Sequence, residues 1–178
     1  MELNRYKTLF LDRDGVINRE RPGDYVKTVD EFIFLPGVFD ALSILNKHFS
    51  RIFIVTNQRG VGRGIMSEDN LLDIHDWMVG EIILKNGRID KLYVCTDVDP
   101  LSENRKPNIG MALQAQKDFP EIDFSKSIMV GNSLSDMKFG KNAGMCAILL
   151  GDKYNDSEKD LSLIDYSFDN LLSFAQKL

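Results

Sequence analysis

Two carboxylates stand together directly after a short apolar run near the start of the chain. The run over residues 8–11 is followed by Asp12, Arg13, Asp14 and Gly15. Side chains alternate along an extended strand, so Asp12 and Asp14 are expected to leave it on the same side. Like charges at this spacing need a cation or a proton between them. A plain Asp-Gly turn would also explain the residues, whereas a calcium loop would need its glycine at position six, not position four.

A second polar cluster, over residues 56–64, follows another apolar run. It begins with the hydroxyl of Thr56 and contains glycines and two cations, Arg59 and Arg63, with no acid. Such a set of donors can surround a phosphate. Glycine-rich turns after strands are common, so this signal alone is weak. The glycines are also spaced wrongly for a dinucleotide-binding G-x-G-x-x-G motif.

Two more clusters follow later apolar runs. Arg105 and Lys106 precede Pro107, which suits the first position of a helix, and the segment over residues 131–136 ends in Asp136. A basic pair of this kind is usually no more than a solvated surface pair. Here both clusters come after strand-like runs, as the first two clusters do. Together the four clusters predict one polar site.

Alternating elements are expected to position this site. Strand-length apolar runs occur at 8–11, 52–55, 92–95, 128–130 and 146–150, and helical patterns lie between them at 38–45, 68–83, 111–115 and 137–143. This order is typical of an α/β domain with a mainly parallel sheet, right-handed crossovers and helices on both faces. Ligands of such sheets bind beyond the carboxyl ends of the strands, where the four clusters lie.

The chain is expected to form a single domain over residues 1–178. After a polar stretch, the tail from about 161 to 178 predicts an edge strand over 166–168 and a last helix capped by Asp169. His75 falls on the apolar stripe of its helix, so we expect it to be a structural residue rather than a ligand.

The composition excludes several classes of protein. The chain has 178 residues, of which 43% are hydrophobic and 28% charged, and a net charge of −5. A soluble globular protein has these proportions, and the negative charge gives no reason to expect nucleic acid or an anionic membrane as partner. No apolar run approaches a membrane span and the start lacks a signal peptide, so a cytoplasmic location is expected. Cys95 and Cys146 are too few for a four-cysteine zinc site.

Taken together, the four clusters resemble the four motifs of the haloacid dehalogenase-like (HAD) phosphohydrolases. The resemblance implies that Asp12 attacks phosphorus to form an aspartyl phosphate and that Asp14 acts as general acid and then base. It implies that Thr56 donates to the phosphoryl group and that Lys106 balances the charge of phosphate and nucleophile. The fourth motif, Gly-Asp-x-x-x-Asp, matches residues 131–136 except at its first acid.

The resemblance also implies a magnesium ion. Asp12, Asp14 through its carbonyl, and residue 132 would be its ligands, and Asp136 would hold a metal-bound water. Residue 132 is Asn132 where the family usually has aspartate. An amide oxygen can coordinate Mg²⁺, but the change removes one negative charge, so weak binding of the ion is expected.

Residues 5–150 resemble one branch of this superfamily, which contains the heptose 1,7-bisphosphate phosphatases and the histidinol phosphatases. The similarity lies in segments 12–18, 24–26 and 32–37, in 55–58 with the Gly-Arg-Gly at 62–64, and in 105–107. It implies a Rossmann-like three-layer domain without a cap domain. Many members hold structural zinc in a cysteine-rich loop after the third strand. This chain has only Cys95 there, so no zinc is expected.

The expected function is therefore the Mg²⁺-dependent hydrolysis of a small phosphorylated sugar, first of all the 7-phosphate of heptose 1,7-bisphosphate, by a monomer. The residues expected to bind the substrate are Asn57, Arg59, Arg63, Arg105, Tyr25 and Arg19. Three alternatives remain open: histidinol phosphate as substrate, a phosphate-accepting signalling domain, and a phosphate-binding protein left inactive by Asn132.

Overall fold

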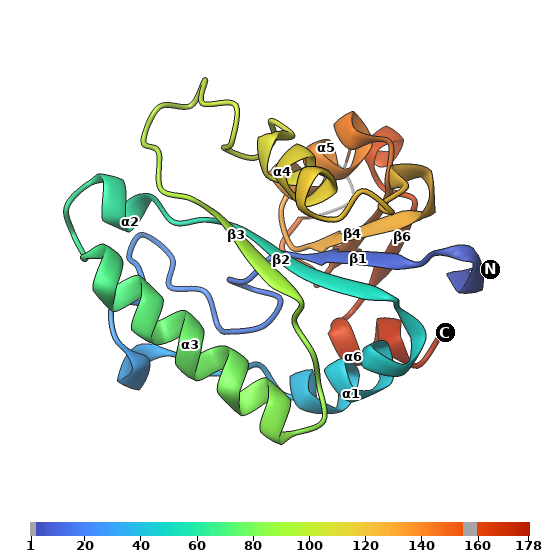
Figure 1. Cartoon of the computed structure of the whole chain (residues 1–178), viewed down its shortest axis with the longest axis horizontal. Helices are drawn as coiled ribbons and strands as arrows, with labels where there is room; N and C mark the ends of the chain where they lie inside the picture. Colours follow the sequence, from blue (N-terminus) through green and yellow to red (C-terminus); the bar gives the residue numbers. More distant parts are fainter. Residues whose placement is uncertain (1–2, 155–159) are drawn as a thin grey trace.

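Six parallel strands form the central sheet of the domain, in the order β3-β2-β1-β4-β5-β6 (Figure 1). The computed structural model describes residues 3–154 and 160–178. The strands are β1 (Thr8–Leu11), β2 (Arg51–Asn57), β3 (Lys91–Cys95), β4 (Ser127–Gly131), β5 (Cys146–Leu150) and β6 (Tyr166–Phe168). The α/β fold expected from the sequence is confirmed, and the sheet is parallel throughout, including the edge strand β6.

Helices cover both faces of this sheet (Figure 1). One face packs on α1 (Val38–His48), α3 (Glu68–Leu84) and α6 (Leu171–Ala175), and the other on α4 (Gly110–Asp118) and α5 (Leu134–Ala143). A one-turn helix, α2, spans Arg59–Gly62, and 3₁₀ segments span Leu3–Arg5, Val29–Glu31, Phe124–Lys126 and Leu161–Leu163. Among the described residues, no helix is both long and apolar enough to cross a membrane.

The strand residues explain why the sheet lies between two helical layers. In β1, Leu9 and Leu11 pack into the core beneath α1 and α3, while Phe10 between them packs into the opposite core beneath α4. Each of these side chains is fully buried. Strands covered on both faces read as continuous apolar runs, which is the pattern seen in the sequence.

Three helix starts differ from the sequence-based expectation. Helix α4 begins at Gly110 rather than at Pro107, because the carbonyl of Lys106 accepts a side-chain hydrogen bond and residues 105–108 form a turn. Helix α5 begins at Leu134, earlier than the expected 137, because Ser133 caps it. The last helix is capped by Asn170, not by Asp169, since Asn170 accepts from the backbone of Ser173.

Candidate active site

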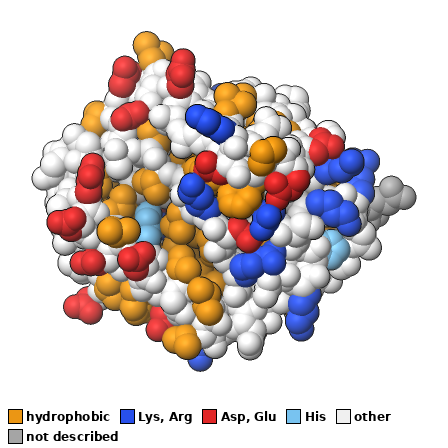
Figure 2. Space-filling model, viewed as in Figure 1, with side chains coloured by type: hydrophobic (Ala, Val, Ile, Leu, Met, Phe, Trp, Pro, Cys, Tyr) orange, Lys and Arg blue, Asp and Glu red, His pale blue; other side chains and the backbone are white. Residues whose placement is uncertain are grey.

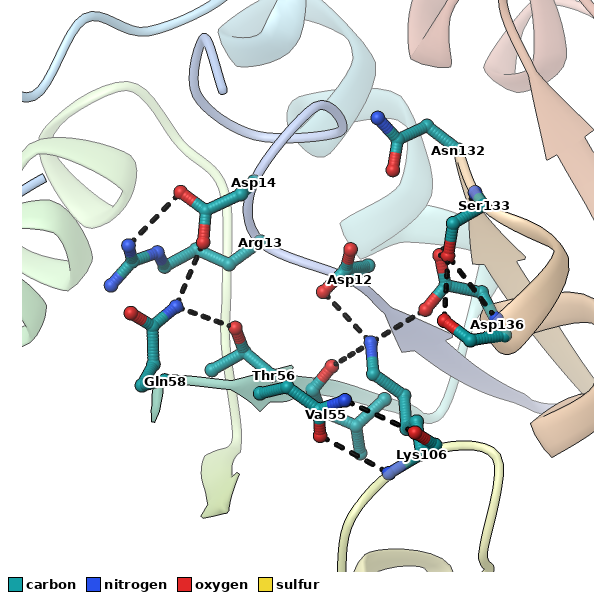
Figure 3. Close-up of polar contacts among 12 residues, drawn as sticks. Asp12, Arg13, Asp14, Val55, Thr56, Gln58, Lys106, Asn132, Ser133 and Asp136 are labelled. Atoms are coloured by element: carbon teal, nitrogen blue, oxygen red, sulfur yellow. Dashed lines mark hydrogen bonds and ion pairs between the residues drawn. The ribbon is translucent and has the colours of Figure 1, made fainter. Parts of the chain in front are cut away.

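A buried lysine joins two buried carboxylates at the carboxyl end of the sheet. Lys106 Nζ lies 2.8 Å from Asp12 Oδ1 and 2.6 Å from Asp136 Oδ1 (Figure 3). The Lys106 and Asp136 side chains are only 2% and 1% exposed, and that of Asp12 is 13% exposed. Burial and the charge of Asp136 raise the pKa of Asp12 to about 7, although the Lys106 ammonium acts in the opposite direction. The two carboxylates keep the pKa of Lys106 raised in spite of its burial.

The backbone around Lys106 is held by β2. The carbonyl of Val55 accepts the third hydrogen bond of Lys106 Nζ, at 2.8 Å. Asn57 forms two bonds to the main chain of Lys106, accepting from its N–H at 3.1 Å and donating to its carbonyl at 3.2 Å. Asn57, which the sequence suggested as a substrate ligand, therefore has both ends of its amide engaged in placing Lys106.

Asp136, which is expected to hold a metal-bound water, has partners on both of its carboxylate oxygens. Its Oδ1 accepts from Lys106, and its Oδ2 accepts from the N–H and the hydroxyl of Ser133 at 3.1 Å and 2.6 Å. Gly131 permits this approach, because a Cβ there would lie 2.2 Å from the Cβ of Asp136. Both oxygens thus have partners inside the protein, among them Lys106, and the role of Asp136 toward a metal-bound water stays a prediction.

Asp14 lies at the same edge of the sheet but has other partners. Its Oδ1 accepts from Arg13 at 3.0 Å and from Asn18 at 2.9 Å, and its Oδ2 accepts from Gln58 at 2.7 Å. Burial alone would raise the pKa of Asp14, but Arg13 and these donors outweigh it, so the pKa is lowered. The same Gln58 amide donates to Thr56 Oγ1 at 2.8 Å. A hydroxyl that accepts one bond keeps its own proton to donate to a ligand.

Arg13 links this carboxylate to helix α3. The Arg13 side chain is buried, and its Nη1 lies 3.0 Å from His75 Nε2. Arginine has only donors, so His75 Nε2 must accept and its proton must sit on Nδ1. Burial and the Arg13 charge lower the pKa of His75 to about 3. This contact agrees with the expectation that His75 is a structural residue rather than a ligand, because His75 holds the Arg13 guanidinium that faces Asp14.

The His75→Gln variant is expected to resist acid better than the wild type. Unfolded histidine binds a proton below its ordinary pKa of 6.5, while folded His75 does not until about 3, so stability is lost as the pH falls between these values. Between these pH values, the free energy of unfolding of the wild type should fall more steeply than that of His75→Gln, by at most about 1.4 kcal/mol per pH unit. A glutamine oxygen can still accept from Arg13, but it does not titrate. Urea unfolding of both proteins at several pH values measures this, and parallel stability profiles would contradict it.

Asn132 faces Asp12 across the mouth of the site. One Asp12 oxygen binds Lys106, while the other is directed toward the Asn132 side chain, whose carbonyl oxygen is turned toward Asp12 (Figure 3). Gly15 lies against Asn132 at a φ of +85°, and a Cβ there would lie 1.8 Å from Asn132 Nδ2. Carboxylate and amide oxygens suit Mg²⁺, which keeps waters or substrate oxygens for its other positions. The donor set therefore fits Mg²⁺, although no group of three His, Cys, Asp or Glu within 3–154 and 160–178 could hold a metal.

Three arginines cluster beside this polar centre. Burial and the charges of Arg59 and Arg63 lower the pKa of Arg105. Arg63 donates to the hydroxyl of Tyr25 at 3.2 Å, and Arg105 to the carbonyl of Asp97 at 3.4 Å. In the described part of the chain, no carboxylate forms an ion pair with any of the three. The cluster is suited to bind an anion.

Two further groups lie apart from this arrangement. Arg19, an expected substrate ligand, is exposed and does not belong to the arginine cluster. It lines a cavity of about 400 Å³ together with Asn132 and Lys153. Cys95 and Cys146 are buried free thiols in β3 and β5, with three other strands of the sheet between them.

Several residues of the site were missed from the sequence. Arg13, Gln58 and Ser133 each contact a predicted site residue. Ser133 carried a signal, because an acid three residues after a serine is typical of a helix capping box. Arg13 and Gln58 lie in segments that carry the family resemblance, but an arginine or glutamine in a strand-end loop does not by itself indicate a contact with Asp14.

Comparison with known proteins agrees with this geometry. A family model described as polynucleotide kinase 3 phosphatase matches residues 7–175. A D-glycero-alpha-D-manno-heptose-1,7-bisphosphate 7-phosphatase of Burkholderia mallei is 40% identical over 152 residues, covering 81% of this chain and 79% of the relative. A D-glycero-beta-D-manno-heptose-1,7-bisphosphate 7-phosphatase of Rhodopseudomonas palustris is 38% identical, covering 79% and 81%.

A solved structure supports the same assignment. The D,D-heptose 1,7-bisphosphate phosphatase of B. bronchiseptica, crystallised with magnesium and phosphate, superposes with a TM-score of 0.83 at 29% identity and covers 96% of this chain and 97% of its own. The chain belongs to the haloacid dehalogenase-like superfamily of phosphatases, in the family that includes these heptose bisphosphate phosphatases.

Proposed function

We propose that the protein is a Mg²⁺-dependent phosphatase that removes the 7-phosphate of D-glycero-D-manno-heptose 1,7-bisphosphate. The observation that carries the proposal is the Asp12–Lys106–Asp136 cluster together with three arginines that have no carboxylate partner among the described residues. The Asp12–Lys106–Asp136 cluster is suited to phosphoryl transfer, and the three arginines are suited to bind a further phosphate on the same substrate. The names of the relatives and of the magnesium and phosphate complex support the same substrate and ion.

In the proposed reaction, an oxygen of Asp12 attacks phosphorus, the bond from phosphorus to the sugar oxygen breaks, and the sugar oxygen takes a proton from Asp14. Water then attacks the aspartyl phosphate and gives a proton to Asp14, which releases phosphate and restores both residues. Asp14 is ionised in the free protein, and it takes up a proton from solvent when repulsion by the incoming phosphate raises its pKa; this is the proton that it gives to the sugar oxygen and regains from the attacking water. Lys106 and the Thr56 hydroxyl stabilise charge on the phosphoryl oxygens.

Asp12, the main-chain carbonyl of Asp14 and the Asn132 amide oxygen would hold the Mg²⁺. The ion neutralises negative charge so that a carboxylate can approach a phosphate. A cavity of about 180 Å³ lined by Asp14, Tyr25 and Gln58 offers space for the sugar next to the acid.

The arginine cluster predicts a preference for a bisphosphate. Wild-type kcat/KM is expected to be at least tenfold higher for heptose 1,7-bisphosphate than for the 7-monophosphate, because a charge-assisted contact is worth about 1.5–3 kcal/mol. Replacement of Arg59 or Arg63 by glutamine should narrow this ratio. The measurement is phosphate release from both substrates, tested with α and β anomers of the bisphosphate.

Arg51→Gln is the matched control for these variants. Arg51 begins β2 at the opposite end of the strand and pairs with Glu121, so its loss should leave the ratio unchanged. Equal rates on the two substrates would contradict the assignment of a second phosphate site.

A nucleic-acid substrate is disfavoured by the surface. Acidic side chains gather along α3 on one side of the face seen in Figure 2, namely Glu68, Asp69, Asp73 and Asp76. Together with the net charge of −5, they would repel a polyanion. A 3′-phosphorylated oligonucleotide is expected to be hydrolysed far more slowly than the sugar bisphosphate.

We further propose a cytoplasmic monomer. The two buried free thiols suit a reducing compartment. Sedimentation of the purified protein tests the oligomeric state.

A further inference from the structure

Asn132 is held by an acid that no motif of the sequence includes. Asn132 Nδ2 donates to Glu20 Oε2 at 3.2 Å, although 112 positions separate the two residues. Asn132 itself is buried at the carboxyl end of β4. Glu20 belongs to the long connection after β1, so its carboxylate reaches the site from a different element.

This contact decides which way the amide faces. An ionised carboxylate only accepts hydrogen bonds, so Asn132 must turn its NH₂ group to Glu20. The carbonyl oxygen then points the opposite way, toward the free oxygen of Asp12 (Figure 3). The reverse orientation would set two acceptor oxygens against each other.

Glu20 is in turn fixed by a cation. Lys153, after β5, lies 3.1 Å from both Glu20 oxygens. Glu20 therefore bridges the loops after β1 and β5 and presents a defined oxygen to Asn132. It touches the proposed metal ligand and not the ion.

We propose that Glu20 is a positioning residue of the metal site, which aims the Asn132 oxygen at the ion. The inference rests on the proposed function for the ion itself. A hydrogen bond from an amide N–H to a carboxylate also polarises the amide and strengthens its oxygen as a ligand. Glu20 thus acts on the ion through the amide of Asn132, to which it is hydrogen-bonded.

Calorimetric titration of the protein with Mg²⁺, without substrate, tests the proposal. Glu20→Gln should weaken Mg²⁺ binding by roughly tenfold, the usual effect of losing a partner of a metal ligand. Asn132→Asp should tighten binding. In the Asn132→Asp protein, Glu20→Gln should no longer weaken binding, because residue 132 would then be a carboxylate that Glu20 repels.

Glu31→Gln is the matched control. It removes the same charge from the same connection, where Glu31 pairs with Arg21. Its Mg²⁺ affinity should stay within twofold of the wild type. Thermal unfolding of each variant establishes that it is folded.

Three results would each overturn the inference. The first is a Mg²⁺ affinity of Glu20→Gln equal to that of the wild type, and the second is an equal loss of Mg²⁺ affinity in Glu20→Gln and Glu31→Gln. The third is that Glu20→Gln weakens Mg²⁺ binding as much in the Asn132→Asp protein as in the wild type. Absence of Mg²⁺ binding in all of these proteins would overturn it as well. If the predicted pattern of affinities appears but no sugar phosphate is hydrolysed, the inference stands and the proposed function fails.

Discussion

The Asp12→Asn variant is expected to lose about four orders of magnitude or more in kcat/KM while it remains folded. The amide has the shape of the carboxylate but cannot form the aspartyl phosphate. It also still offers an oxygen to Lys106, which lies 2.8 Å from Asp12. Phosphate release and the midpoint of thermal unfolding are the two measurements.

Asp118→Asn is the control for this variant. Asp118 pairs with Lys91 and accepts from Tyr93, at the end of α4, and makes no contact with the proposed site. Its activity should match the wild type. Turnover by Asp12→Asn within tenfold of the wild type would remove Asp12 as the nucleophile.

The Lys106→Met variant is expected to lose both activity and stability. Removing the ammonium leaves Asp12 and Asp136 as buried like charges, and the loss of one partner of a buried ion pair costs about 3–5 kcal/mol. Activity should also fall sharply, since the ammonium that would balance the charge of the phosphoryl group is lost. Urea unfolding measures the first effect and phosphate release the second.

A second substitution separates the two effects. Adding Asp136→Asn to Lys106→Met removes one of the repelling charges, so part of the stability should return while activity stays low. If Lys106→Met has the same free energy of unfolding as the wild type, the ion pairs of Lys106 do not stabilise the fold and this prediction is wrong.

The layout of the fold could be predicted because it depends on local pattern. Each interior strand is a continuous apolar run, and three of the four polar clusters follow such a run directly. The positions of Asp12, Thr56 and Asn132 at one sheet edge therefore follow from the order of elements. Lys106 is further from its strand, β3, and only the resemblance to a known family placed it.

The partners of these residues could not be predicted, because they depend on contacts between distant segments. Asn57 binds the main chain of Lys106, 49 positions away, and Arg13 meets His75 on α3, 62 positions away. No spacing in the sequence encodes such pairs. The same reason hid the contact of Glu20 with Asn132 and the sharing of Asp136 between Lys106 and Ser133.

The most direct test of the proposed function is phosphate release from D-glycero-D-manno-heptose 1,7-bisphosphate with Mg²⁺ and after its removal by a chelator. The account predicts that one phosphate, the one at C7, is released per substrate, that chelation abolishes the release, and that added Mg²⁺ restores it. Failure to release phosphate at any Mg²⁺ concentration, from a folded wild-type protein, would contradict the account and favour a phosphate-binding protein inactivated by Asn132.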